Sequence, residues 1–167
     1  MSTDTNDHAR LWELIKDTRF GMYTHQHDDG MLHSHPLTTQ NRSVDKDATL
    51  YFFVPRDGEI ARHVADNNPV NVAYANPDDD SYVSVAGKAR LVEDDERKRA
   101  LFNPAAKAWF PKGVEDPNLG LLAVRIEHAE FWDVKESKVT QLLKMAKAAV
   151  TGDGPPQMGE HKKLDVR

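Results

Sequence analysis

The chain has 167 residues, of which 39% are hydrophobic and 29% charged, and these proportions fit one compact soluble domain with a sizeable core. A formal net charge of −5 argues against a duplex nucleic-acid partner, and the absence of cysteine excludes disulfides, thiolate nucleophiles and thiolate metal sites. We expect a cytoplasmic protein with no membrane partner, because the sequence shows neither a signal peptide nor an apolar run long enough to cross a bilayer.

The first part of the sequence predicts a helix, a hairpin and a third strand. Apolar residues recur at helical spacing over 11–15, and alternating segments at 19–25 and 31–40 flank an Asp-Gly turn, which indicates an antiparallel hairpin. Residues 48–54 form a third, aromatic strand. Asp57 stands where it could cap a following helix, whose apolar side chains lie on one face before an Asn-Asn-Pro sequence ends it.

The middle of the sequence predicts two more strands and a charged helix. Residues 70–75 and 82–92 alternate around an acidic turn, and Gly87 marks a bulge or a close approach of two backbones. Asp94 is placed to cap a charged helix over 96–102.

A long strand and a last helix follow. Residues 119–134 are predicted as a sixth strand that is long enough to bend, and residues 137–150 as a helix with one apolar side. Trp12 and Trp132 are expected in the core, because large aromatic side chains contribute most when they are buried.

Six strands with inserted helices, and no regular βαβ alternation, predict a mainly β fold: a six-stranded antiparallel Greek-key barrel with peripheral helices. We assign residues 1–152 to this domain, including the N- and C-terminal helices. Residues 153–167 are polar and are expected to form a loosely ordered tail.

One predicted strand is unsuited to core packing alone. It carries His33, His35 and Thr38 at positions where a core strand would be apolar, and Pro36 removes one backbone donor from the ladder. The next strand is aromatic and runs into a turn and a helix start. Together these segments indicate a site for a flat, phosphorylated ligand.

The order of short motifs over residues 11–159 resembles the pyridoxamine 5′-phosphate oxidase-like FMN-binding split-barrel superfamily, in the branch of the general stress proteins. Each motif alone is weak, whereas six in the same order are specific. They are TLYFF at 49–53, NPVNV at 68–72, YVSVAG at 82–87, KAWFP at 107–111, AEFWD at 129–133 and QLLKMAKAAVTG at 141–152.

The resemblance implies a split barrel and a homodimer that holds one flavin, FMN, in each of two clefts at the subunit interface. A small molecule would donate or accept the electrons. The implied cofactor-binding residues are His33, Ser34, His35, Pro36, Leu37 and Thr38 along the flavin, Phe53 and Val54 beside them, Gly58, Glu59 and Ile60 by the phosphate, Tyr82 by the phosphoribityl chain, and Trp109 from the other subunit.

The phosphate end departs from the pattern that the resemblance implies. Relatives usually place basic residues where this chain has Ile60 and His33. Arg56, Arg62 and His63 lie within about a turn of the helix start and are the candidates to compensate, since a guanidinium can chelate a phosphate. If none of them reaches, a differently anchored cofactor such as FAD or a deazaflavin is the alternative to FMN.

Three functions remain open. The first is a flavin-dependent oxidoreductase that uses a reduced nicotinamide, and the second is a flavin-binding module for storage or sensing, without catalysis. No side chain stands out as a catalytic acid or base, and the polar C-terminus argues against true pyridoxamine 5′-phosphate oxidation. The third is a metalloprotein that uses the pairs His25/His27 and His33/His35, each of which projects to one face of a strand. No carboxylate or further histidine stands in an evident partner pattern, so we predict no metal ligand.

Overall fold

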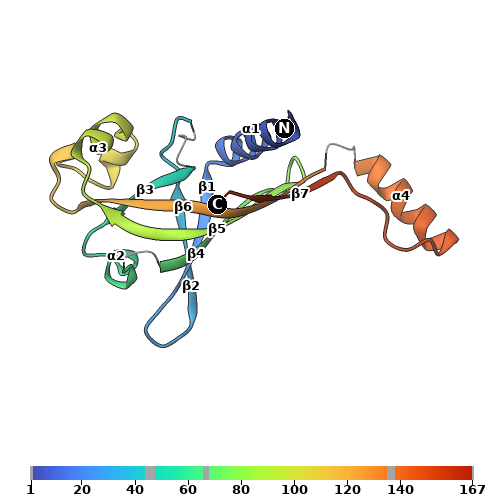
Figure 1. Ribbon diagram of the computed structural model, residues 1–167, viewed down its shortest axis with the longest axis horizontal. Helices are drawn as coiled ribbons and strands as arrows, with labels where there is room; N and C mark the ends of the chain where they lie inside the picture. The colour runs from blue at the N-terminus through green and yellow to red at the C-terminus, as the bar shows by residue number, and fades with distance from the viewer. Residues whose placement is uncertain (1, 44–47, 66–67, 135–137, 167) are drawn as a thin grey trace.

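The structure is a computed structural model that describes residues 2–43, 48–65, 68–134 and 138–166 (Figure 1). None of the helices in these ranges is both long and apolar enough to cross a membrane. The elements in chain order are α1 (Ser2–Thr18), β1 (Phe20–Gln26), β2 (Leu32–Thr38), β3 (Thr49–Pro55), α2 (Glu59–His63), β4 (Asn68–Asn76), β5 (Ser81–Val92), α3 (Asp95–Leu101), the 3₁₀ turns η1 (Ala106–Ala108) and η2 (Gly113–Glu115), β6 (Leu119–Asp133), α4 (Lys138–Thr151) and β7 (Glu160–Asp165).

The strands form one antiparallel sheet in the order β2-β1-β4-β5-β6-β3. β7 pairs with the C-terminal half of β6, beyond the part that pairs with β3. The sheet curls until its two ends meet at a single bridge between Thr39 and Phe52. Helices lie outside the sheet, and α4 projects away from it (Figure 1). The predicted mainly β split barrel with peripheral helices is therefore confirmed.

The core lies inside the curl and follows the alternation of the strands. Val72, Val85 and Phe131 are fully buried, on neighbouring strands of the sheet. The apolar stripe of α1 covers one opening of the curl, with Leu14 and Ile15 buried against the same core. Burial of this kind, at about 25 cal/mol per Å² of apolar surface, is the main source of stability for such a sheet.

The bulge or close approach predicted at Gly87 is confirmed. The pairing of β5 with β6 shifts its register between Ala86 and Gly87, which is a β-bulge. A Cβ atom on Gly87 would overlap the backbone carbonyl of Arg125 on the neighbouring strand. Only glycine permits this approach, and the bulge lets the two longest strands curl instead of lying flat.

Four expectations from the sequence differ from the structure. The tail expected to be loosely ordered contributes β7, whose polar sequence suits an edge strand with only Leu164 buried. Asp57 does not cap α2: a tight turn from Pro55 to Gly58 places Gly58 at the cap, with no side-chain hydrogen bond. The helix ends at His63, shorter than expected. Trp132 is 36% exposed, because β6 turns its side chain to the outer face of the sheet.

We expect Gly87→Ala to lower the free energy of unfolding by about 3 kcal/mol, because the added methyl group must push two paired strands apart. Gly113→Ala is the control: Gly113 has a φ of +75° and open space around it, so the cost there is limited to backbone strain of about 1–2 kcal/mol. Urea unfolding measures both. Equal losses in the two variants would contradict the role assigned to the bulge.

Candidate functional site

The predicted site residues border an opening between the two ends of the sheet. β2 and β3 are bridged at Thr39 and Phe52, and the adjacent backbone N–H of Gln40 donates to the carbonyl of Tyr51 at 2.9 Å. Among the described residues no strand pairing joins β2 and β3 beyond this bridge. We call the space between residues 33–38 and 53–55 the split.

Backbone groups of β2 alternate between β1 and the split. The N–H of Thr39 donates to the carbonyl of Arg19 at 2.9 Å, on the β1 side. Because direction alternates along a strand, the backbone groups of Thr38, Pro36 and Ser34 point toward the split. Pro36 therefore removes no donor from the ladder with β1, which explains why a proline is tolerated here.

The side chains on the β3 edge of the split differ in what they can offer. Phe53 is half-buried and its ring lies 6.0 Å from that of Phe102, at 49°. Val54 is fully buried, so only its backbone can meet a ligand in the split.

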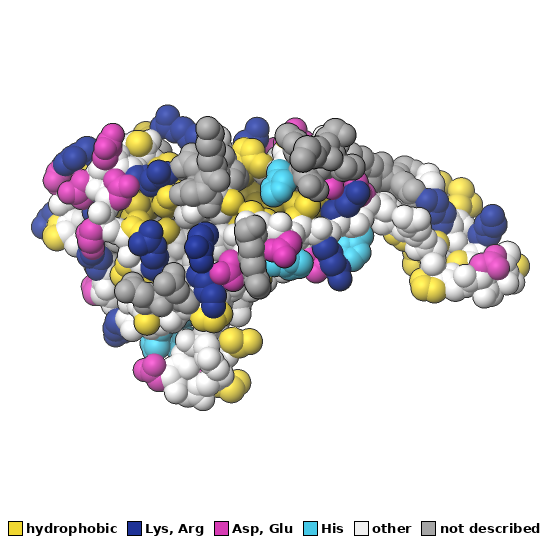
Figure 2. Space-filling model, in the orientation of Figure 1, with side chains coloured by type: hydrophobic (Ala, Val, Ile, Leu, Met, Phe, Trp, Pro, Cys, Tyr) yellow, Lys and Arg dark blue, Asp and Glu magenta, His cyan; other side chains and the backbone are white. Residues whose placement is uncertain are grey.

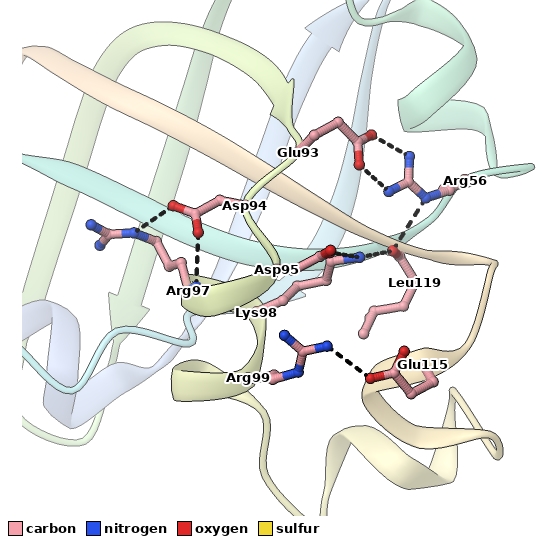
Figure 3. A network of polar contacts seen from close by, with 9 residues as sticks. All are labelled: Arg56, Glu93, Asp94, Asp95, Arg97, Lys98, Arg99, Glu115 and Leu119. Carbon is pink, nitrogen blue, oxygen red and sulfur yellow. Dashed lines mark hydrogen bonds and ion pairs between the residues drawn. The ribbon is translucent and has the colours of Figure 1, made fainter.

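The turn after β3, where the sequence predicts a phosphate site, contains few free positive charges. Ile60 is buried in the core. Arg56 is held by Glu93 in a two-pronged ion pair at 2.6 and 2.9 Å, and its Nε donates to the carbonyl of Leu119 at 3.3 Å (Figure 3). The hydrogen bonds between them raise the pKa of Arg56 and lower that of Glu93. Arg62, by contrast, is exposed on α2.

Tyr82 and Trp109 lie outside the split of their own chain. Tyr82 is 41% exposed on the outer face of β5, opposite Trp132, and Trp109 is 83% exposed after η1. Three hollows on the surface lie beside α1, α3 and their adjoining loops, and none of them is lined by a residue predicted at the flavin site. These three hollows of the described part of the chain therefore lie apart from the residues predicted to bind the flavin.

The structure gathers the four strand histidines into one cluster and adds residues that sequence reasoning missed. His25 faces His33 across the β1–β2 ladder, and His27 and His35 lie on the same side of the hairpin. α2 adds Glu59 and His63, a carboxylate and a further histidine that no pattern in the sequence had indicated. We call these six residues the histidine cluster: His25, His27, His33, His35, His63 and Glu59.

Stacking and close contacts hold the histidine cluster together. His27 is sandwiched between the rings of His33 at 3.6 Å and His63 at 4.1 Å. Its Nε2 is 3.2 Å from Nε2 of His25, and its Nδ1 is 3.4 Å from the carboxylate of Glu59. The other carboxylate oxygen is 3.7 Å from Nε2 of His35.

The rings at the base of the cluster are neutral at neutral pH. Burial, together with the neighbouring histidines, lowers the pKa of His25 to about 4. The same causes lower the pKa of His27, which Glu59 partly offsets. A neutral imidazole keeps one ring nitrogen as an acceptor, which is the form that binds metals.

The signal that could have found the cluster is the register of the hairpin. An Asp-Gly turn between two His-x-His pairs places His25 opposite His33, with His27 and His35 one step away on the same face of the hairpin. The contribution of α2 could not be read in this way, because it depends on how the chain packs after β3.

Closure of the sheet depends on a buried hydroxyl pair. Thr39 Oγ1 and the hydroxyl of Tyr74 are 2.6 Å apart, both residues are buried, and burial raises the pKa of Tyr74. We expect Thr39→Val and Tyr74→Phe each to cost about 1–2 kcal/mol of unfolding free energy, because each leaves one buried hydroxyl without a partner.

A double-mutant cycle checks this pair. The double variant should cost about as much as one single variant, since it removes both hydroxyls at once. Additive losses would show that the two groups do not interact, and that the closure rests on the backbone bridge alone.

Comparison with known proteins gives a consistent result. The family described as "Pyridoxamine 5'-phosphate oxidase like" matches residues 6–156. Among curated proteins, Protein bli-3 from Neurospora crassa is 29% identical over 91 residues, which is 50% of this chain. The match covers 44% of that relative, so the chain accounts for less than half of its length.

Solved structures extend the likeness to the whole fold. A protein named general stress protein 26 from Jannaschia sp. CCS1 covers 99% of both chains with a TM-score of 0.73, at 23% identity. The general stress FMN/FAD binding protein from Xanthomonas citri is 27% identical and covers 80% of this chain and 92% of its own, with a TM-score of 0.68. A general stress family protein from Xanthomonas campestris pv. campestris is also 27% identical and reaches a TM-score of 0.71.

Proposed function

The chain belongs to the pyridoxamine 5′-phosphate oxidase like family, and from that premise we propose that it binds a flavin in the split between β2 and β3. The observation that carries the proposal is that β2 and β3 do not pair beyond the Thr39–Phe52 bridge in the described part of the chain. The sequence singles out the same two strands. The similar protein from Xanthomonas citri is named as an FMN/FAD binding protein.

The residues at the split fit the ring of a flavin. The carbonyl of Pro36 points into the split and offers an acceptor to the polar edge of a ring, without a competing N–H. Phe53 supplies half-buried aromatic surface from the opposite edge. Cofactor sites are typically mainly apolar, with a few polar groups that fix the orientation of the ligand. The bound flavin would supply electron transfer, and the protein would supply orientation and hydrogen bonds.

The residues at the turn after β3 fit the phosphate of a flavin less well than the split fits its ring. Glu59 stands at the helix start, and Arg56 is already paired with Glu93. A phosphate placed here meets a carboxylate and gains no free guanidinium from Arg56. Arg62, which is exposed on α2, remains as a guanidinium near the phosphate, so we propose FMN as the ligand, held mainly through its ring, with FAD next.

We further propose a homodimer with the flavin at the subunit interface. The outer face of the sheet carries exposed apolar side chains that a single chain leaves uncovered: Phe20, Met22, Tyr82 and Trp132. Met22 lies opposite Ala73 on β4, and Tyr82 lies opposite Trp132 on β6, so the patch crosses four strands. An apolar patch of this kind is typical of an interface. Trp109, which is 83% exposed, would reach the partner's split.

The proposed reaction is the transfer of electrons from a reduced nicotinamide to a small acceptor. His33 and His35, the titratable residues of the split, pack their rings in the histidine cluster, so the chemistry would rest on the flavin. Oxidation of reduced nicotinamide by the flavin-loaded protein, above the rate of free flavin, supports this reaction. Tight flavin binding without such turnover supports storage or sensing instead.

Flavin titration tests the binding proposal. We expect saturable quenching of flavin fluorescence at one FMN per chain, in metal-free buffer. Removal of a charge beside the phosphate changes binding by about 1 kcal/mol, so Glu59→Gln should tighten FMN about fivefold and leave riboflavin unchanged. Asp78→Asn, the same charge change in the exposed β4–β5 turn, should alter neither. Failure of both FMN and FAD to bind would overturn the proposal.

Light scattering after gel filtration tests the dimer. We expect Met22→Glu to convert the dimer to a monomer, because it places a charge within the apolar patch. Met31→Glu is the control, since Met31 is 63% exposed in the hairpin loop, outside the patch. A wild-type protein that is monomeric at micromolar concentration contradicts the proposed interface.

A further inference from the structure

Buried polar atoms in and beside the histidine cluster have no hydrogen-bond partner among the described residues. Among the described residues, the buried side-chain atoms without a hydrogen-bond partner are Nδ1 of His25, Nε2 of His35 and the hydroxyl of Tyr23. All three come from the β1–β2 hairpin, and Tyr23 faces His35 across the ladder. A buried polar atom without a partner is unfavourable, and Nε2 of His35 is the one of the three that an ion in the cluster would satisfy.

The arrangement of ring nitrogens suits a metal ion. One nitrogen from each of His25, His27 and His35 lies within 4.8 Å of the other two. Nε2 of His25 and Nε2 of His27 are 3.2 Å apart. Two imidazoles bound to one tetrahedral zinc ion, at about 2.0–2.1 Å each, place their nitrogens about 3.3–3.4 Å apart. The unliganded cluster is therefore close to the spacing that such an ion requires.

Groups around His27 would hold its ring as a ligand. The carboxylate of Glu59 is 3.4 Å from Nδ1 of His27, so it can accept a hydrogen bond from Nδ1–H and leave the lone pair of Nε2 for a metal. A carboxylate on the second ring nitrogen is a common support of metal-bound histidine. The rings of His33 and His63 stack on its two faces, and His63 is itself fixed by a 2.8 Å hydrogen bond to the carbonyl of Glu59.

Burial and access are both compatible with a metal site. His25 is 2% exposed at the base of the cluster, so this ring has little freedom to turn away. Histidine side chains reach the surface where α2 meets the β1–β2 hairpin, which gives an ion a route in (Figure 2). The carboxylates of Glu59 and of Asp28, which is 3.7 Å from His63 Nε2, lie at the rim and offset positive charge.

From this geometry we propose that His25, His27 and His35 bind one divalent first-row transition metal ion, such as Zn²⁺, with Glu59 as the positioning residue of His27. The ion would replace the contact between His25 and His27 by two coordinate bonds and would give Nε2 of His35 the partner it lacks. Imidazole nitrogens suit zinc, nickel and copper ions and disfavour magnesium and calcium. Three protein ligands leave a further position for water or a small anion.

The site does not depend on the proposed flavin function. The two proposals share His35 on β2 and Glu59 on α2, whereas His25 and His27 belong to the metal proposal alone. They can still fail separately, provided that metal binding is measured on the flavin-free chain and flavin binding in metal-free buffer.

Titration with Co²⁺ and displacement by Zn²⁺ test the proposal on the full chain, stripped of metal and of flavin and carrying no histidine tag. We expect one Co²⁺ per chain with the intense visible absorption of a tetrahedral site, and stoichiometric loss of that absorption on addition of Zn²⁺. Calorimetric titration with Zn²⁺ then gives the affinity of each variant.

Variants separate the cluster from adventitious binding. His35→Gln should weaken Zn²⁺ at least 100-fold because it removes a ligand. Glu59→Gln should weaken it about 10-fold because it removes only the support of His27. His128→Gln, the same change at an exposed position on β6, should leave the affinity unchanged. Circular dichroism checks that each variant is folded.

Two results would overturn the proposal. One is the absence of saturable binding at one ion per chain, and the other is equal Zn²⁺ affinity in wild type and His35→Gln. If His35→Gln fails to fold, His27→Gln serves as the ligand variant with the same expected loss. A chain that binds FMN but no metal contradicts only this proposal, and a chain that binds metal but no flavin contradicts only the flavin function.

Discussion

The meeting of β2 with β3 at Thr39 and Phe52 is the constraint on which the rest of the structure depends. The bridge closes the curled sheet at one end only, and a buried hydroxyl pair between Thr39 and Tyr74 secures it from inside. Had the two strands paired along their whole length, their backbone groups would have satisfied each other. Because they part, one edge of each strand stays available to a ligand, and Pro36 is accommodated on such an edge.

The bulge at Gly87 and the histidine cluster lie at two other places on the same sheet. The bulge bends β5 and β6, the two longest strands, so that β3 can come round to β2. The cluster occupies the far end of the hairpin, where β2 has left β3 and α2 packs in its place. The bridge that closes the sheet, the bulge that bends it and the histidine cluster at its open end therefore all belong to the same sheet.

Much of the fold could be predicted from the sequence, because it rests on local patterns. The alternation in 19–25 and 31–40, the Asp94 cap, whose side chain accepts from Arg97 N–H, and the Gly87 bulge are all present. β7 was missed because its polar sequence carries no alternation that a buried strand would show. Trp132 was misplaced because residue type alone does not say which face of β6 is inside.

The site was less predictable, for reasons of long-range packing. The sequence shows two His-x-His pairs, and a hairpin register can bring these together, but it does not show that α2 carries Glu59 and His63 to them. It shows Arg56 beside the expected phosphate position, but not that Glu93, 37 residues away, holds its guanidinium. The flavin residues were named from a resemblance: residues 33–38 and 53–54 lie on the two edges of the split, whereas Tyr82 and Trp109 lie outside it.

The most direct test of the account is a crystal structure of the protein grown with FMN. The account predicts one flavin ring in the split, with the carbonyl of Pro36 at its polar edge and Phe53 beside it. It also predicts that Trp109 of the partner subunit covers the ring. Flavin density at a different place on the chain, or an open split that stays empty at saturating FMN, would contradict it.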